Sequence, residues 1–169
     1  AAFKRREVYA TTGPRISLRF FGGWNFTPAD MNSSDYANIG YTKGVPMGGD
    51  LRRGNQGDAP GFLISAARDP IGANLDRVQV VKGWLDAEGK SHEKVFNVAW
   101  AGARQPDSAG NLPAIGNTVN QATAAVSNLI GADELSTLWV DPEFDASVRA
   151  FYYIRALQIP TARHSLYDA

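Results

Sequence analysis

Apolar and polar residues alternate in two stretches that lie far apart in the chain. In residues 16–21, Ile16, Leu18 and Phe20 alternate with a face that carries Ser17 and Arg19. Residues 149–160 alternate in the same way over a longer span and end at Pro160. A period of two is typical of a strand with one buried face, so each stretch predicts a strand.

Three further apolar runs occupy the centre of the chain. Residues 61–69, 75–89 and 94–102 are rich in Val, Ile, Phe and Trp, and the turn-like sequences DPIGAN and AEGKSHE separate them. Runs of this kind joined by short turns predict three consecutive strands in an antiparallel meander. In the second run, the alternation predicts that Val78 and Val80 face the core.

The remaining segments are loops or are ambiguous. Residues 22–60 are rich in glycine and proline and predict a long irregular excursion, interrupted at most by a short extended piece at residues 36–43. For residues 118–131, the alanines and the capping character of Asn117 favour a helix, whereas the neighbouring segments favour a strand. We favour a strand that pairs with residues 134–140.

Together these elements predict an all-β fold, mainly an antiparallel β-sandwich with long Gly/Pro-rich loops. Short helices are expected at most at the N-terminus and near residues 118–130. The first seven residues are good helix formers with three cations, as in the last turn of a helix. We therefore interpret residues 1–12 as the end of a helix and residues 13–169 as a single β-rich domain.

Composition narrows the function classes. The 169 residues carry 17 basic and 17 acidic side chains and no cysteine. A formal charge of zero gives no general attraction for nucleic acid, and the absence of cysteine excludes disulfides and thiolate chemistry. No apolar run approaches the roughly 18 residues that a membrane-spanning helix needs. We expect neither nucleic acid as a partner nor a membrane span.

The chemistry-bearing residues form no complete catalytic or metal-binding set. His92 and His164 lack a second ligand at metal-binding spacing, and we interpret His92 as a solvated turn residue. The sequence DPEFD, residues 141–145, is interpreted as a turn in which Asp141 or Asp145 caps backbone amides. We predict no catalytic residue and no metal site in this chain.

Two weaker candidate sites lie in the long loop. Glycines beside Asp50, with Arg52 and Arg53 close in sequence, are compatible with an anion site. Three aromatic residues are candidates for stacking against a sugar: Trp24, Tyr36 and Tyr41. A carbohydrate-type ligand-binding sandwich and a structural interface module are therefore alternatives. Trp100 and Trp139 lie in apolar surroundings and are expected in the core.

Several long strings give the chain a specific resemblance. It resembles the C-terminal portion of a bacterial family, domain of unknown function 3604, in the strings RREVYATTGPRISLRFFGGW, GVPMGGDL, DPIGANLDRVQVVKGWLD, NVAWAG, GNTV, IGADELSTLWVDPEFD and AFYYIRALQIPTARHSLYDA. Full-length members of that family resemble metal-dependent hydrolases of the PHP (polymerase and histidinol phosphatase) type.

The resemblance implies a function that the residues alone do not. It implies that this chain is the C-terminal accessory β-domain of a metal-dependent phosphate- or sulfate-ester hydrolase and is not catalytic alone. The divalent metal would belong to an N-terminal catalytic domain of the same polypeptide, with no cofactor in this chain, and a periplasmic or secreted location would follow if an export signal lies upstream. Seven residues at the two ends of the chain would approach that domain: Arg5, Arg6, Tyr9, Thr11, Thr12, Arg163 and His164. An exposed apolar patch near residues 1–13 and Tyr167 would mark its docking surface.

Overall fold

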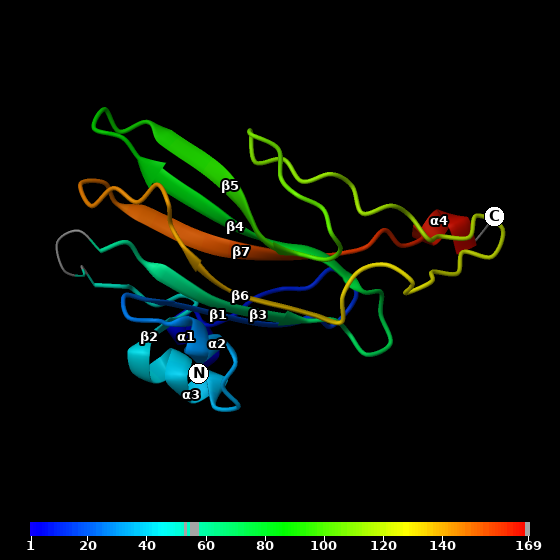
Figure 1. Ribbon diagram of the computed structural model, residues 1–169, viewed down its shortest axis with the longest axis horizontal. Helices are drawn as coiled ribbons and strands as arrows, with labels where there is room; N and C mark the ends of the chain where they lie inside the picture. The colour runs from blue at the N-terminus through cyan, green and yellow to red at the C-terminus, as the bar shows by residue number, and fades with distance from the viewer. Residues whose placement is uncertain (53, 55–57, 168–169) are drawn as a thin grey trace.

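The computed structural model describes residues 1–52, 54 and 58–167 (Figure 1). Its strands are β1 (Ser17–Gly23), β2 (Gly44–Pro46), β3 (Gly61–Ala67), β4 (Leu75–Leu85), β5 (Ser91–Trp100), β6 (Glu134–Val140) and β7 (Ala150–Gln158). Its helices are α1 (Ala2–Arg5), α2 (Pro28–Met31), α3 (Tyr36–Lys43) and α4 (His164–Tyr167). In the part of the chain so described, no helix is long and apolar enough to cross a bilayer.

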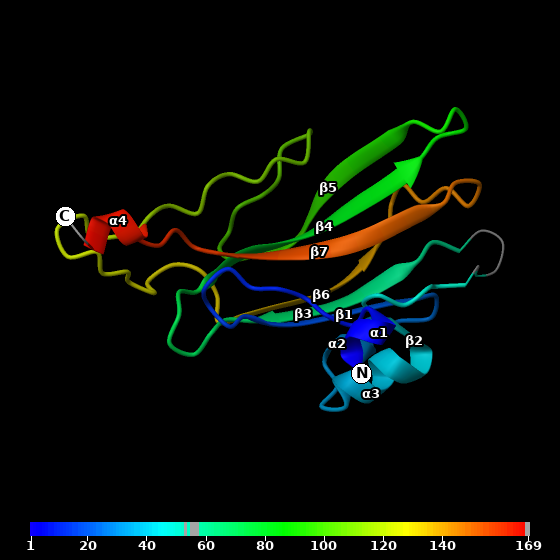
Figure 2. The ribbon, with the colours of Figure 1, turned by 180° about the vertical axis from the view of Figure 1, so that it is seen from behind.

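The strands form two antiparallel sheets that pack face to face, as predicted for an all-β sandwich. Over the described residues, one sheet has the order β2-β1-β3-β6 and the other the order β5-β4-β7. Figure 2, seen from behind, shows β5, β4 and β7 as one layer above the layer that contains β6, β3 and β1. The strands predicted at residues 16–21 and 149–160 correspond to β1 and β7.

The core lies between the two sheets. Val78 and Val80 on β4 are fully buried, which confirms the predicted inward face of that strand. Opposite them, the ring of Phe62 stacks on Phe20 at 5.3 Å and contacts Tyr152 on β7 at 4.5 Å. Burial of each large apolar side chain stabilises the fold by about 1.5–3 kcal/mol, so this inter-sheet layer holds the sandwich together.

The predicted meander of three strands is wrong in one pairing. β4 and β5 form a hairpin, but β3 pairs with β1 and β6 and not with β4. Residues 68–74 cross from one sheet to the other, and the Arg68 guanidinium holds this crossing by donating to the carbonyls of Asp69, Pro70 and Gly72. Turn composition indicates that the chain reverses but not which sheet it enters.

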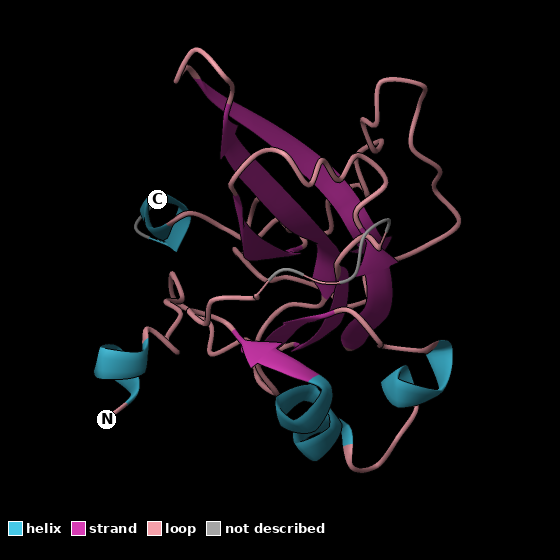
Figure 3. Ribbon diagram, turned by 90° about the vertical axis from the view of Figure 1, so that its left-hand side faces the viewer, coloured by secondary structure: helices cyan, strands magenta, loops and turns pink. Residues whose placement is uncertain are grey.

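The expected extended piece at residues 36–43 is also wrong, because these residues form helix α3 on the outer face of the first sheet (Figure 3). Gly40 allows this approach: a Cβ there would lie 2.5 Å from the ring of Phe21. Lys43 at the end of α3 binds the carboxylate of Asp30 in α2 at 2.7 Å. A capping box of Thr27 and Asp30, with Pro28 at the first turn, begins α2 and could have indicated a helix.

Residues 118–131 form neither the favoured strand nor the alternative helix. They contain turns and a single bridge between Val119 and Val126, while residues 134–140 pair with β3 as strand β6. The Asn117 side chain accepts from the amide of Val119, and that of Asn120 accepts from the amide of Ala122. Such local bonds compete with both regular structures.

The two ends of the chain lie far apart along the long axis. α4 projects beyond one end of the sheets, whereas α1 lies beside the sheets at a distance from it (Figures 1 and 2). After α1, Arg6 adopts a left-handed conformation with φ 59°. Its carbonyl lies against Gly48, where no Cβ would fit. Residues that follow α1 are thereby directed along the first sheet.

The contact between Gly40 and Phe21 gives a stability prediction. Replacement Gly40→Ala is expected to lower the free energy of unfolding by about 1–3 kcal/mol, because the added methyl overlaps a buried ring. Alanine has the higher helix propensity, so propensity alone predicts the opposite sign. Urea unfolding measures the difference. Thr42→Ala, at an exposed position of the same helix, is the control and is expected within about 0.5 kcal/mol of the wild type.

Candidate functional site: an open cleft between the sheets

The sandwich closes on one side and opens on the other. On the closed side, Phe96 of β5 contacts Trp139 of β6 at 5.0 Å, and Lys94 pairs with Glu143. On the open side, β7 has no second neighbour among the strands of the described residues. A cleft of about 1020 Å³ lies there, between β7 and the β1-β2 part of the first sheet.

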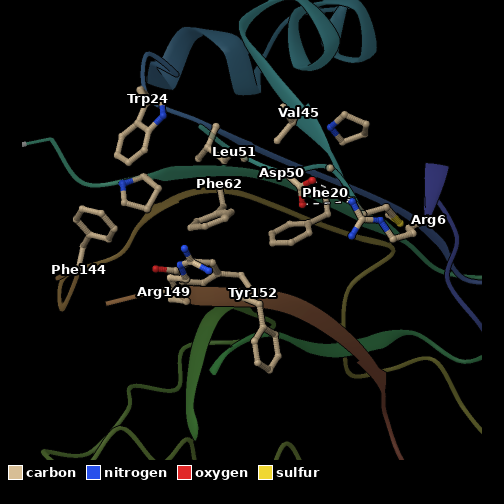
Figure 4. Close-up of a pocket in the computed structure, with 18 of the residues that line it drawn as sticks. Arg6, Phe20, Trp24, Val45, Asp50, Leu51, Phe62, Phe144, Arg149 and Tyr152 are labelled. Atoms are coloured by element: carbon tan, nitrogen blue, oxygen red, sulfur yellow. Dashed lines mark hydrogen bonds and ion pairs between the residues drawn. The ribbon is translucent and has the colours of Figure 1, made fainter. Parts of the chain in front are cut away.

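Mainly aromatic side chains from both sheets and from the adjoining loops line this cleft (Figure 4). Phe20, Phe62, Trp24 and Leu51 form one wall, and Phe144, Arg149 and Tyr152 form the other. Trp24 contacts Phe144 edge to face at 5.8 Å, and its Nε1 donates to the carbonyl of Arg52 at 2.8 Å. Its indole is therefore fixed at the cleft wall by partners from two loops.

A second cavity of about 720 Å³ continues the cleft along β7. Apolar side chains line it from both sides, with Ile16 and Leu18 facing Ile154 and Ala156 of β7, and residues 8–12 also line it. The two cavities share Arg6, Phe20, Met47, Gly48 and Tyr152. We call this continuous opening the β7 seam.

A buried polar cluster fixes one wall of the seam. Lys82 on β4 donates to Asp141 at 2.6 Å and to the Glu143 carbonyl at 2.6 Å, with 5% and 0% of the Lys82 and Asp141 side chains exposed. The hydroxyl of Tyr152 donates to the same carboxylate at 2.6 Å. Burial, with the bond to Asp141, raises the pKa of Tyr152. The cluster holds the β6–β7 connection against the second sheet.

The sequence predicted part of this cluster. Asp141 accepts from the amide of Glu143 and Asp145 accepts from the amide of Ser147, so the prediction that Asp141 or Asp145 caps backbone amides in DPEFD is confirmed, and both do so. The ion pair with Lys82 was not predicted. The sequence does contain a signal for a buried lysine: Lys82 lies two residues after Val80, on the inward face of an apolar strand.

Several predicted residues meet at the seam. The Arg6 guanidinium bonds both carboxylate oxygens of Asp50 at 3.2 Å, at one end of the first cavity. Tyr9, Thr11 and Thr12 line the second cavity. The remaining ones are less directly placed: Arg5 pairs with Glu7, Arg52 is exposed, and Arg53 lies outside the described residues.

Other predicted residues lie elsewhere. Arg163 and His164 are exposed at α4, far from α1 (Figures 1 and 2), so the structure does not bring the two ends together. Tyr36 and Tyr41 belong to α3 and contact Phe21 of β1, with 6.2 and 5.1 Å between ring centroids. Trp24 is thus the one member of the proposed aromatic trio at the cleft.

The described acidic and histidine side chains form no metal-binding group, and His92 differs from its predicted setting. Across residues 1–52, 54 and 58–167, no group of three His, Cys, Asp or Glu side chains could hold an ion. His92 lies in β5 and not in a solvated turn: its Nε2 is 2.6 Å from Asp86, and its ring stacks on Trp84 at 5.3 Å. Trp84 lies directly opposite His92 in the β4–β5 hairpin, and this contact explains why His92 is not the predicted solvated turn residue.

Loss of one partner in the buried cluster tests its structural role. Lys82→Met is expected to lower the free energy of unfolding by about 3–5 kcal/mol, because it leaves the Asp141 carboxylate buried without a counterion. Tyr152→Phe removes one hydrogen bond and is expected to cost about 1 kcal/mol. A double-mutant cycle with Asp141→Leu, followed by denaturant unfolding, measures the coupling. A Lys82→Met chain as stable as the wild type would contradict the assignment.

Acid stability tests the pair at the tip of the β4–β5 hairpin. The hydrogen bond from His92, with that from the Lys90 amide, lowers the pKa of Asp86 in the folded chain. Its contribution is therefore present above the unfolded pKa of about 4 and is lost as the pH falls through the lower folded value. Asp86→Asn should reduce the loss of Tm on acidification from neutral pH. The control Glu88→Gln, at an exposed neighbour, should leave the profile unchanged.

Comparison with known proteins identifies the family. The model of the family described as "Protein of unknown function (DUF3604)" matches residues 1–169. The comparisons with curated proteins and with solved structures give no match. Since the family match spans the chain, from α1 through both sheets to α4, this chain belongs to the DUF3604 family.

Proposed function

We propose that this chain is a non-catalytic accessory β-domain of a metal-dependent phosphate- or sulfate-ester hydrolase. The hydrolase class, of PHP type, rests on the sequence resemblance described above. The observation that supports an accessory role is the exposure of apolar side chains in the N-terminal segment: Phe3 is 84%, Val8 42% and Tyr9 49% exposed, and Val8 and Tyr9 also line the second cavity. Apolar side chains exposed in one short segment favour contact with another protein.

Positive charge at the β7 seam would help to hold an anionic substrate of a neighbouring active site. Arg6 is neutralised by Asp50, whereas Arg149 forms no hydrogen bond or ion pair with any described residue. In such a hydrolase a divalent metal would supply an activated water, and no residue set described here fits that metal. This chain would contribute walls, exclusion of water and a guanidinium.

The alternatives differ in what supports them. A carbohydrate-binding sandwich would keep Trp24 at the cleft, but Tyr36 and Tyr41 lie at α3 and cannot extend that platform. A purely structural interface module is favoured by the same exposed surface at Phe3 and Tyr9. Catalytic activity in a longer polypeptide that includes this chain would favour the accessory role over the purely structural module.

Metal content and turnover test the proposal directly. The purified chain, supplied with manganese or zinc, is expected to retain far less than one equivalent of metal and to hydrolyse neither phosphate nor sulfate aryl esters. A longer family polypeptide that includes the upstream region should do both. Stoichiometric metal in this chain, with turnover that a chelator abolishes, would contradict the proposal.

Surface variants test the docking side. Phe3→Ser and Tyr9→Ser should leave the free energy of unfolding within about 0.5 kcal/mol of the wild type, because Phe3 is largely exposed and Tyr9 is about half exposed. They should weaken association with a separately expressed upstream region, measured by calorimetry. Leu129→Ser, at an 88% exposed apolar position in another loop, is the matched control. Equal loss with all three variants would show that the effect is not specific to this surface.

A further inference from the structure

Among the described residues, the second sheet has one strand fewer than the first, and the β7 seam lies where a fourth strand would be. Over the described residues, three strands face four, and β7 pairs through Ala150–Gln158 with β4 only. The backbone groups on its other edge have no strand partner there. Residues 8–12 run along the seam but, within the described chain, donate no backbone hydrogen bond to β7.

The seam has the surface of an incomplete core. The inward residues Tyr152, Ile154 and Ala156 of β7 remain half-buried, whereas Val78 and Val80 of the neighbouring strand are fully buried. Leu18 of β1 and Ile16, which precedes that strand, lie across the seam from them. An added strand with apolar side chains at every second position would cover both sets at once.

β7 also lacks the sequence features that protect many edge strands. Such edges carry proline, bulges or inward charges that prevent pairing with another chain. The sequence AFYYIRALQ of β7 has no proline, and its single charge, Arg155, lies on the outward face beside Tyr153. An edge of nine residues, about 30 Å long, is therefore available.

From these observations we propose that the β7 seam accepts an extended segment of a partner polypeptide, which adds a strand to the free edge of β7. The segment carries apolar residues at alternate positions toward Leu18 and Ile154 and acidic residues on its other face. The acidic face follows from Arg155, which is exposed on the outward face of β7 and forms no ion pair with a described residue. This inference concerns what occupies the seam and does not depend on the proposed hydrolase.

Charge favours such a partner over a second copy of this chain. Two β7 strands paired around Ile154 would bring Arg155 of each copy near the other, with no carboxylate on either strand. Like charges on neighbouring strands are unfavourable, whereas glutamate or aspartate on an incoming strand would pair with Arg155. The free edge supplies affinity through backbone bonds, and Arg155 supplies preference for acidic sequences.

A selection experiment tests the inference while the partner is still unidentified. A phage-displayed library of random decapeptides is selected on the immobilised full chain, with removal of phage that also bind the Ile154→Lys variant. We expect enriched peptides with apolar residues at positions i, i+2 and i+4 and acidic residues between them. A synthetic enriched peptide should bind in fluorescence anisotropy and slow amide exchange in β7. No enrichment, or apolar residues at helical spacing, would overturn the inference.

Matched charge reversals complete the test. Arg155→Glu should weaken binding of the synthetic peptide by about tenfold with an unchanged Tm, because it replaces attraction by repulsion at an exposed position. Lys90→Glu, exposed at the β4–β5 turn, should leave binding unchanged. Equal effects of both variants would overturn the assignment to β7, as would light scattering that shows a dimer with protected β7 amides. Metal binding or turnover by this chain would contradict the proposed function and leave this inference intact.

Discussion

The organisation of this protein depends on strand β7, which is at once a wall of the core and an edge of its sheet. Tyr152 packs against Phe62 in the inter-sheet layer at 4.5 Å, so β7 cannot leave the sandwich without loss of core contacts. Its other edge has no strand neighbour among the described residues. The same element therefore stabilises the fold and leaves it open, which places the cleft beside β7 and not beside β5.

The buried ion pair makes this opening a defined surface. Lys82 and Asp141 connect β4 with the segment that leads into β7, and Tyr152 binds the same carboxylate. Desolvation makes such a pair costly to break, although it adds less to stability than an apolar core of equal size. Its main consequence is geometric: Phe144 and Arg149, which follow Asp141, are held at the cleft wall opposite Trp24.

Local pattern predicted the elements better than their arrangement. Alternation of side chains identified β1, β7 and the inward face of β4, because a strand on a core records its burial in its own sequence. The crossing at residues 68–74 could not be predicted, since it depends on the pairing of β3 with β1 and β6 and on the ion pair of Arg68 with Asp133, which join residues far apart in sequence. At the site, Trp24, Arg6 and Asp50 were foreseen as candidates, but their meeting at one cleft, and the pairing of Lys82 with Asp141, depend on residues far apart in sequence.

The central claim, that the edge of β7 is open in the free chain, is tested most directly by amide hydrogen exchange resolved by residue with NMR. The account predicts an alternating pattern in β7, where amides directed at β4 are protected and the intervening amides exchange rapidly, while both sets in the central strand β4 are protected. Uniform protection along β7 at low protein concentration would contradict the account, because it would show that the edge is already covered by this chain itself.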